Sequence, residues 1–295
     1  MRSNRAPTGA DDRGIHASTA PPPLANRLEN HVLPIASLSL DLDNKWSYMR
    51  THGDPGWESF PSYLDVAVPR FVELLRSLDL VITVFVVGQD AAIESNRHLL
   101  RTLANEGHEI GNHSFRHEPW LHLYDAEAIR AELASAEEHI LAATGQRPIG
   151  FRGPGFSVSP TVLRSLAARG YQYDASTFPT FLGPLARAYY FFTARLDPEE
   201  KRQRSRLFGG FCEGFRPVRP YRWDVDGSEL IEIPVTTMPI FRLPIHVSYL
   251  LYLARFSRGL ALAYFRSALL LCRATGVAPS LLLHPLDLLD KQDAA

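Results

Sequence analysis

Apolar positions along the chain alternate between two periods, that of a buried strand and that of an amphipathic helix. Residues 35–40 form a short apolar run that ends at Asp41, as a buried strand would. The stretch 63–78 then carries apolar residues three and four positions apart, which predicts a helix. Further strands are predicted at 80–87, 148–151, 230–235 and 280–283, and further helices at 96–106, 126–144, 160–169 and 246–274. Strands and helices that alternate at this spacing predict an α/β sheet, open or closed into a barrel.

Two stretches interrupt this pattern. Residues 1–34 mix Pro, Ala, Asp and Arg without the apolar run of a signal peptide, so we expect a disordered leader. Residues 181–225 are rich in aromatic residues, Gly, Pro and Arg without a clear period, which predicts an insertion. One catalytic domain is then expected over 35–290. The missing signal peptide predicts a cytoplasmic location, with peripheral contact to the inner membrane left as an alternative.

Charge and cysteine content narrow the classes of partner. The 295 residues carry 31 basic and 32 acidic side chains, a net charge of -1, so no overall field attracts nucleic acid and none is expected as a partner. Cys212 and Cys272 lie far apart and have no metal-type spacing, which argues against a disulfide framework or a zinc ribbon. The oligomeric state is not indicated by any of these properties.

Two short motifs carry residues that bind metals. His113 and His117 are four positions apart, so on one helical turn their imidazoles would face the same way, although chance gives such pairs in a chain with eleven histidines. Asp41 and Asp43 follow a predicted strand, where a turn or a helix cap is the alternative reading. A hydrolytic zinc site needs about three ligands of these types and an open position, which Asp43, His113 and His117 supply. Asp41 is then free to act as a base.

Two more predicted strand ends carry reactive or permissive residues. The segment from Arg152 to Gly155 follows one strand, and its glycines allow the backbone to approach a substrate closely. His284 follows the last strand. Polar groups at the carboxyl ends of several strands are typical of the active face of an α/β barrel enzyme.

The order of these motifs resembles the polysaccharide deacetylase (NodB-homology) family of carbohydrate esterases. The pattern is D-x-D, H-[ST]-x-x-H, R-x-P-G and a late L-x-x-H, and the resemblance covers about residues 35–285. It implies a distorted (β/α) barrel. It also implies a hydrolase of non-peptide carbon–nitrogen bonds, which removes an acetyl group from an N-acetylated sugar or a lipid-linked glycan.

The resemblance also implies a role for each motif residue. Asp43, His113 and His117 take the places of the ligands to one divalent metal, most often zinc, with cobalt or nickel as alternatives. Asp41 takes the place of the general base and His284 that of the general acid.

Three further residues match supporting positions of the family. Arg152 takes the place of the arginine that pairs with the base, and Gly155 that of the residue whose backbone N–H helps to hold the oxyanion. Asp174 resembles the acid that orients the catalytic histidine. Because Leu42 separates the two acids, which of them is the base and which the ligand stays open, as does a metal-free amidohydrolase.

Other activities share this pattern. A deformylase or a cyclic-amide hydrolase would use the same site and differ only in the group accepted. A catalytically silent scaffold that binds carbohydrate or a membrane is the alternative from another class. Such a scaffold predicts broken motifs, and the five residues of the predicted metal, base and acid roles are all present.

Three tryptophans lie near the first motifs in sequence. Aromatic faces stack on sugar rings, so we expect Trp46 and Trp120 to line the substrate cleft, and Trp57 to pack in the core.

The helical region 246–274 carries a basic stripe. Arg255, Arg258, Arg266 and Arg273 fall within a narrow arc of one helix face among apolar residues. Such a stripe fits either the solvated outer face of a barrel helix or contact with an anionic lipid surface. No uncharged apolar stretch approaches the ~18 residues that cross a bilayer, so no transmembrane helix is predicted.

Overall fold

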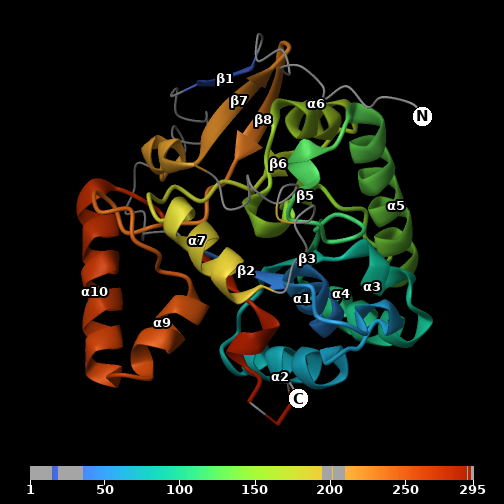
Figure 1. Ribbon diagram of the computed structural model, residues 1–295, viewed down its shortest axis with the longest axis horizontal. Coiled ribbons are helices and arrows are strands. Elements are labelled where there is room, and N and C mark those ends of the chain that lie inside the picture. The colour runs from blue at the N-terminus through green and yellow to red at the C-terminus, as the bar shows by residue number, and fades with distance from the viewer. Residues whose placement is uncertain (1–14, 19–35, 195–200, 202–209, 291, 294–295) are drawn as a thin grey trace.

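A nine-stranded sheet forms the centre of the molecule, in the order β1-β7-β8-β6-β5-β4-β3-β2-β9 (Figure 1). The computed structural model describes residues 15–18, 36–194, 201, 210–290 and 292–293. The strands are β1 (Ile15–Ser18), β2 (Ser37–Leu42), β3 (Thr83–Val86), β4 (Glu109–Asn112), β5 (Gly150–Phe151), β6 (Tyr173–Asp174), β7 (Tyr221–Val225), β8 (Ser228–Glu232) and β9 (Ser280–Leu283). All pairs from β9 to β8 are parallel, and β7 and β1 extend the sheet in antiparallel fashion.

Helices connect the parallel strands and cover the sheet (Figure 1). They are α1 (Lys45–His52), α2 (Leu64–Ser77), α3 (Gly88–Ala92), α4 (Arg97–Asn105), α5 (Ala126–Thr144), α6 (Pro160–Ala168), α7 (Gly183–Thr193), α9 (Val247–Ala254) and α10 (Arg258–Thr275). Short 3-10 helices lie at Trp57–Ser59, Glu94–Asn96, Leu121–Leu123, Pro154–Phe156, Phe211–Phe215 and Pro285–Asp287. Among the helices of the described residues, none is both long and apolar enough to cross a membrane.

The largest core lies between the first strands and the helices α2, α4 and α5. In α2 the apolar residues Leu64, Phe71 and Leu75 lie on one face and are buried against side chains such as Leu40 and Leu42 of β2. Burial of side chains of this size contributes about 1.5–3 kcal/mol each. The same packing turns the other residues of β2, at odd positions, away from this core.

The loop after β8 joins the two sides of the sheet. The Val235 N–H donates to the carbonyl oxygen of Thr177 beyond β6 at 2.9 Å, and the Thr236 N–H donates to Ser280 of β9, also at 2.9 Å. Backbone bonds therefore bridge the gap between the two ends of the parallel sheet. The predicted distorted (β/α) barrel is confirmed.

Three expectations about the chain's organisation need correction. Residues 15–18 form β1, because the edge of β7 offers unpaired backbone groups, so the leader is not disordered there; its remainder lies outside the described residues. Residues 221–225 of the predicted insertion are β7 and belong to the sheet. The single helix predicted at 246–274 is two helices, since the Ser257 side chain accepts a hydrogen bond from the Leu260 N–H and starts α10 anew.

Candidate active site

The two aspartates lie where β2 ends. Leu40 and Leu42 face the helix-covered core, so Ser39, Asp41 and Asp43 alternate to the opposite side, where all three are buried. The next residue caps α1: the Asn44 side chain accepts a hydrogen bond from the Lys45 N–H at 2.8 Å. Asp43 is therefore held between the end of a strand and the start of a helix.

The two histidines follow β4 in a loop rather than in a helical turn. Ser114 and His117 both have left-handed backbone conformations, with φ of 61° and 51°. Side chains hold this shape, because the Ser114 N–H donates to Asn112 Oδ1 at 2.8 Å and the His117 N–H donates to Ser114 Oγ at 3.1 Å. The loop still brings the imidazoles together, with ring centroids 5.0 Å apart.

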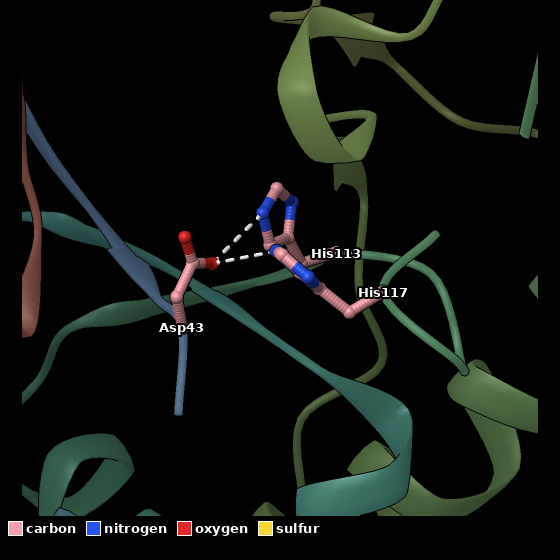
Figure 2. A group of neighbouring side chains, drawn as sticks. All are labelled: Asp43, His113 and His117. Atoms are coloured by element: carbon pink, nitrogen blue, oxygen red, sulfur yellow. Dashed lines mark ion pairs between the residues drawn. The ribbon is translucent and has the colours of Figure 1, made fainter. Parts of the chain in front are cut away.

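Asp43, His113 and His117 converge on one point (Figure 2). Their ligand atoms lie within 4.8 Å of one another, and all three residues are buried. Asp43 Oδ1 lies 3.2 Å from His113 Nε2 and 2.9 Å from His117 Nε2. The predicted ligand set is therefore a cluster in space.

The cluster fits a divalent metal ion. Within the described part of the chain, His117 Nδ1 is buried without a partner, and the buried Asp43 Oδ1 has only the two histidine Nε2 atoms beside it, which is costly unless another group satisfies these atoms. His113 Nδ1 lies 2.6 Å from the carbonyl oxygen of Arg152, so this nitrogen carries the proton and Nε2 offers its lone pair to the cluster. One carboxylate and two imidazoles are a donor set typical of a hydrolytic metal site.

Charges in the cluster oppose the effect of burial. Burial would raise the pKa of the Asp43 carboxyl, but His117 and His113 outweigh it and hold that pKa well below its usual range. Burial would likewise lower the pKa of His113, but Asp41 and Asp43 raise it. Burial, with the charge of Asp43, raises the pKa of Tyr48 well above its usual value. Tyr48 therefore stays a neutral hydroxyl beside the Asp–His–His cluster.

Arg152 holds Asp41. Its guanidinium donates from Nη1 to Asp41 Oδ1 at 2.7 Å and to Ser39 Oγ at 2.8 Å, and from Nε to the carbonyl oxygen of Ala175 at 3.0 Å. It also stacks over the Phe85 ring at 4.4 Å and is 1% exposed. The arginine pairs with the aspartate as expected, and it leaves Asp41 Oδ2 on the side of His113, 4.0 Å from Nε2.

Gly155 lies on the wall of a cleft of about 1080 Å³; none of Asp43, His113 and His117 lines it, but Pro119, just after the His117 loop, does. Residues from several parts of the chain line the cleft, among them Pro119, Ser176, His246 and Tyr249. Gly155 has φ of 58°, and a Cβ there would stand 2.9 Å from Pro119 Cβ. The backbone at Gly155 is thus held in the wall by a conformation that favours glycine.

His284 follows β9 in register with the base position. Leu283 pairs with Leu40 across the sheet, so the residues after them, His284 and Asp41, lie at the same level on neighbouring strands. Ser248 of α9 lies with Oγ 3.1 Å from His284 Nδ1.

His246, at the start of α9, is the histidine beside His284. Their ring centroids are 6.4 Å apart. Burial, with the charge of His284, lowers the pKa of His246 to about 4. His246 is therefore a neutral side chain of the cleft at ordinary pH.

The role expected of Asp174 is wrong. Its carboxylate accepts from Ser176 Oγ at 2.5 Å and is not paired with His284. Burial, with the nearby charge of Glu232, raises its pKa well above the usual range. Ser176 and Glu232 lie against the Asp174 carboxyl, and the contact to His284 Nδ1 comes from Ser248 instead.

Trp46 does not line the cleft as expected. It is 1% exposed, its Nε1–H donates to Asp90 Oδ1 at 3.0 Å, and it packs edge-on against Phe60. The half-buried Trp120 follows Pro119 of the cleft wall, so its contact with a substrate stays a prediction. Trp57 is also only half buried and lies under the guanidinium of Arg50 rather than in the core.

Sequence reasoning missed three residues that support the site. Tyr48 contacts the metal cluster, Ser248 contacts His284, and Asp90 holds both Asn44 and Trp46 behind the cluster. A helical reading of 45–52 would have placed Tyr48 one turn from Asn44. No sequence signal indicates the other two, which lie far in the chain from the residues they contact.

The fold and the site together define a distorted α/β barrel with a buried Asp–His–His cluster at the carboxyl ends of its strands. Residues 54–173 match the model of the polysaccharide deacetylase family. The match includes His113, His117, Arg152 and Gly155.

Individual curated relatives match part of the chain. The chain is 33% identical over 105 residues to the peptidoglycan-N-acetylmuramic acid deacetylase of Bacillus subtilis, which covers 35% of this chain and 39% of that protein. The chain spans less than half the length of the curated relatives it matches.

Solved structures extend the likeness in fold over most of the chain. A Mycobacterium smegmatis protein assigned as a polysaccharide deacetylase is 19% identical, with a TM-score of 0.56 over 90% of this chain and 86% of that one. An allantoinase is 17% identical, with a TM-score of 0.52 over 94% and 89%.

Proposed function

We propose that this protein is a metal-dependent hydrolase that removes the acetyl group from the amide nitrogen of an N-acetylated sugar or a lipid-linked glycan. The buried cluster of Asp43, His113 and His117, beside the Asp41–Arg152 pair, is the observation that carries the proposal. The curated relative that acts on peptidoglycan supports the substrate class. Zinc is the ion we expect, since it accepts this mixture of nitrogen and oxygen ligands.

The ion would supply Lewis acidity toward the acyl oxygen and lower the pKa of water beside it. Asp41 takes the proton of the attacking water on Oδ2, while the bond from Arg152 to Oδ1 holds the carboxylate in place. The Gly155 N–H, in the cleft wall, then donates to the oxygen that gains charge.

His284 protonates the leaving amine. The ring gives up its Nε2 proton as an imidazolium and ends neutral, and Ser248 Oγ, 3.1 Å from Nδ1, orients it. Because His284 and Asp41 lie at the same level of neighbouring strands, acid and base reach the same reacting group. The cleft that Gly155 and His246 line has space for a sugar and part of its carrier.

The test compares metal content and acetate release for two matched double variants. Asp43→Ala/His113→Ala removes two ligands, whereas Asp65→Ala/His98→Ala removes the same side-chain types from exposed positions. We expect about one ion per chain and acetate release from N-acetylated glucosamine oligomers in the wild type and the control. Both should be lost in the ligand variant.

Other outcomes contradict the proposal in different ways. No bound metal after repletion with zinc, cobalt and nickel would contradict the metal centre. Bound metal with release of formate, or with opening of a cyclic amide and no acetate, would contradict the deacetylase and favour its close alternatives. Bound metal without any turnover would favour a silent scaffold.

A further inference from the structure

The α9–α10 hairpin exposes large apolar side chains of the kind that globular proteins usually bury. Helix α9 reads Val-Ser-Tyr-Leu-Leu-Tyr-Leu-Ala and has no buried residue. Across the two helices and their turn, large apolar side chains are between 44% and 72% exposed: Leu251, Tyr252, Phe256, Leu260, Leu262 and Leu270. We call these residues the hairpin surface. A concentration of exposed apolar side chains of this kind marks an interaction site.

The charge of this region has one sign. Residues 233–286 contain five arginines and no Asp, Glu or Lys. Arg255, Arg258, Arg266 and Arg273 are exposed, and none of the four forms an ion pair with another described residue. The hairpin is therefore basic without internal compensation, although the whole chain is close to neutral.

Leucine and arginine alternate along the outer face of α10. Ala261, Ala268 and Cys272 are its buried residues and face the body of the protein. Leu262, Arg266, Leu270 and Arg273 follow one another at intervals of four, four and three, so they form one line on the opposite side. Figure 1 shows α10 as the outermost element on its side of the molecule.

We propose that the hairpin surface docks on an anionic phospholipid membrane, with the apolar side chains in the headgroup boundary and the arginines on lipid phosphates. Arginine suits this position, because its aliphatic stem lies along apolar surface while the guanidinium reaches the phosphate. A second copy of the chain fits less well, since it would bring two basic surfaces together without an acid to pair them. A nucleic acid would match the arginines but leave the leucines between them exposed.

The docking surface adjoins the cleft. Tyr252 belongs to the hairpin surface and also lines the cleft, as does Tyr249 from the same helix. A substrate carried on a lipid in that membrane therefore enters the cleft from the hairpin side. This consequence rests on the proposed deacetylase function, whereas the docking does not.

Flotation of the full chain with vesicles tests the docking without any activity assay. The probes are vesicles of phosphatidylcholine with and without phosphatidylglycerol. We expect the wild type to bind only the anionic vesicles and to dissociate as the salt concentration rises. Arg266→Gln/Arg273→Gln should weaken binding about 25-fold, at about fivefold per arginine. The control Arg130→Gln/Arg147→Gln, at exposed positions in α5 and the loop that follows it, should bind within about twofold of the wild type.

A second pair of variants tests the contribution of the exposed leucines to membrane binding. Leu262→Ser/Leu270→Ser should also weaken flotation, whereas Leu141→Ser, at an exposed leucine of α5, should not. All seven positions are exposed, so thermal unfolding without vesicles should match the wild type. Wild-type binding that ignores lipid charge and salt, or equal losses in variants and controls, would overturn the proposal. Self-association in solution that Leu262→Ser/Leu270→Ser abolishes, or tighter binding to a random oligonucleotide than to vesicles, would assign the surface to another partner and overturn it too.

Discussion

The protonation state of Asp90, which lies behind the Asp–His–His cluster, makes the stability of the protein depend on pH. The side chain is 1% exposed, and its Oδ1 accepts from Asn44 Nδ2 at 2.7 Å and from Trp46 Nε1 at 3.0 Å. Burial, with the charge of Asp43, raises its pKa from 3.8 to about 7, against the opposing effect of the bonds from Asn44 and Trp46. Asp90 is therefore a carboxyl whose proton is kept by the folded state.

The sign of the linkage follows from where the proton is held. Between pH 3.8 and pH 7 the folded protein keeps the Asp90 proton that the unfolded chain has lost, so stability falls as the pH rises. The slope is about 1.4 kcal/mol per pH unit, which integrates to about 3 kcal/mol between pH 5 and pH 8. Asp90→Asn keeps an oxygen acceptor for Asn44 and Trp46 but has no proton to lose. The variant should therefore gain about 3 kcal/mol relative to the wild type over this range.

Urea unfolding of both proteins at pH 5, 6, 7 and 8, at one fixed metal concentration, measures this difference. Every other titrating group is common to the two proteins, so the pH dependence of the difference belongs to Asp90. Asp65→Asn, at an exposed aspartate, should give a difference that does not change with pH. A flat difference for Asp90→Asn as well would refute the reasoning, because Asp90 would then be ionised in the folded protein.

Two further substitutions test residues beside the Asp–His–His cluster, one through turnover and one through stability. Arg152→Lys keeps the positive charge but loses the guanidinium group that bonds Asp41. We expect turnover to fall at least about tenfold while elemental analysis still finds the metal. Unchanged turnover would show that Asp41 needs no such partner. Gly155→Ala puts a Cβ 2.9 Å from Pro119 at a φ of 58°, so urea unfolding should show a loss of about 1–2 kcal/mol. An alanine variant as stable as the wild type would show that this loop adapts.

The bounds of a helix could be predicted to the residue where the sequence carries a capping residue at both ends. Helix α5 begins after Asp125, whose side chain accepts from the Ala128 N–H, and it ends at Gly145 in the left-handed conformation. The helix expected over 246–274 failed because its apolar period continues through the break. There only the cap at Ser257 separates α9 from α10, and a serine within an apolar helix is a weak signal.

Contacts between buried side chains were not predictable. Trp46 was expected in the cleft because its aromatic face suits a sugar, yet it donates to Asp90, 44 positions away. Asp174 was assigned by resemblance to the orientation of His284, and the contact to that histidine comes from Ser248 instead. Such pairings depend on which helix lies behind which strand, and the local sequence carries no record of that arrangement.

The Asp–His–His cluster was predicted from its residue types and motif order, and strand register explains why three of the motifs meet. Leu42 pairs with Val86, Val86 with Asn112, and Asn112 with Phe151. The residues just after three of these four are Asp43, His113 and Arg152, so parallel pairing alone places them in one row at the carboxyl edge of the sheet. The strand before His113, β4, was not among those predicted from the sequence, so the register explains the cluster only once the structure is known. By the same reasoning, a one-residue slip of β4 against β3 would remove His113 from the row, so metal affinity reports on strand register as directly as on ligand identity.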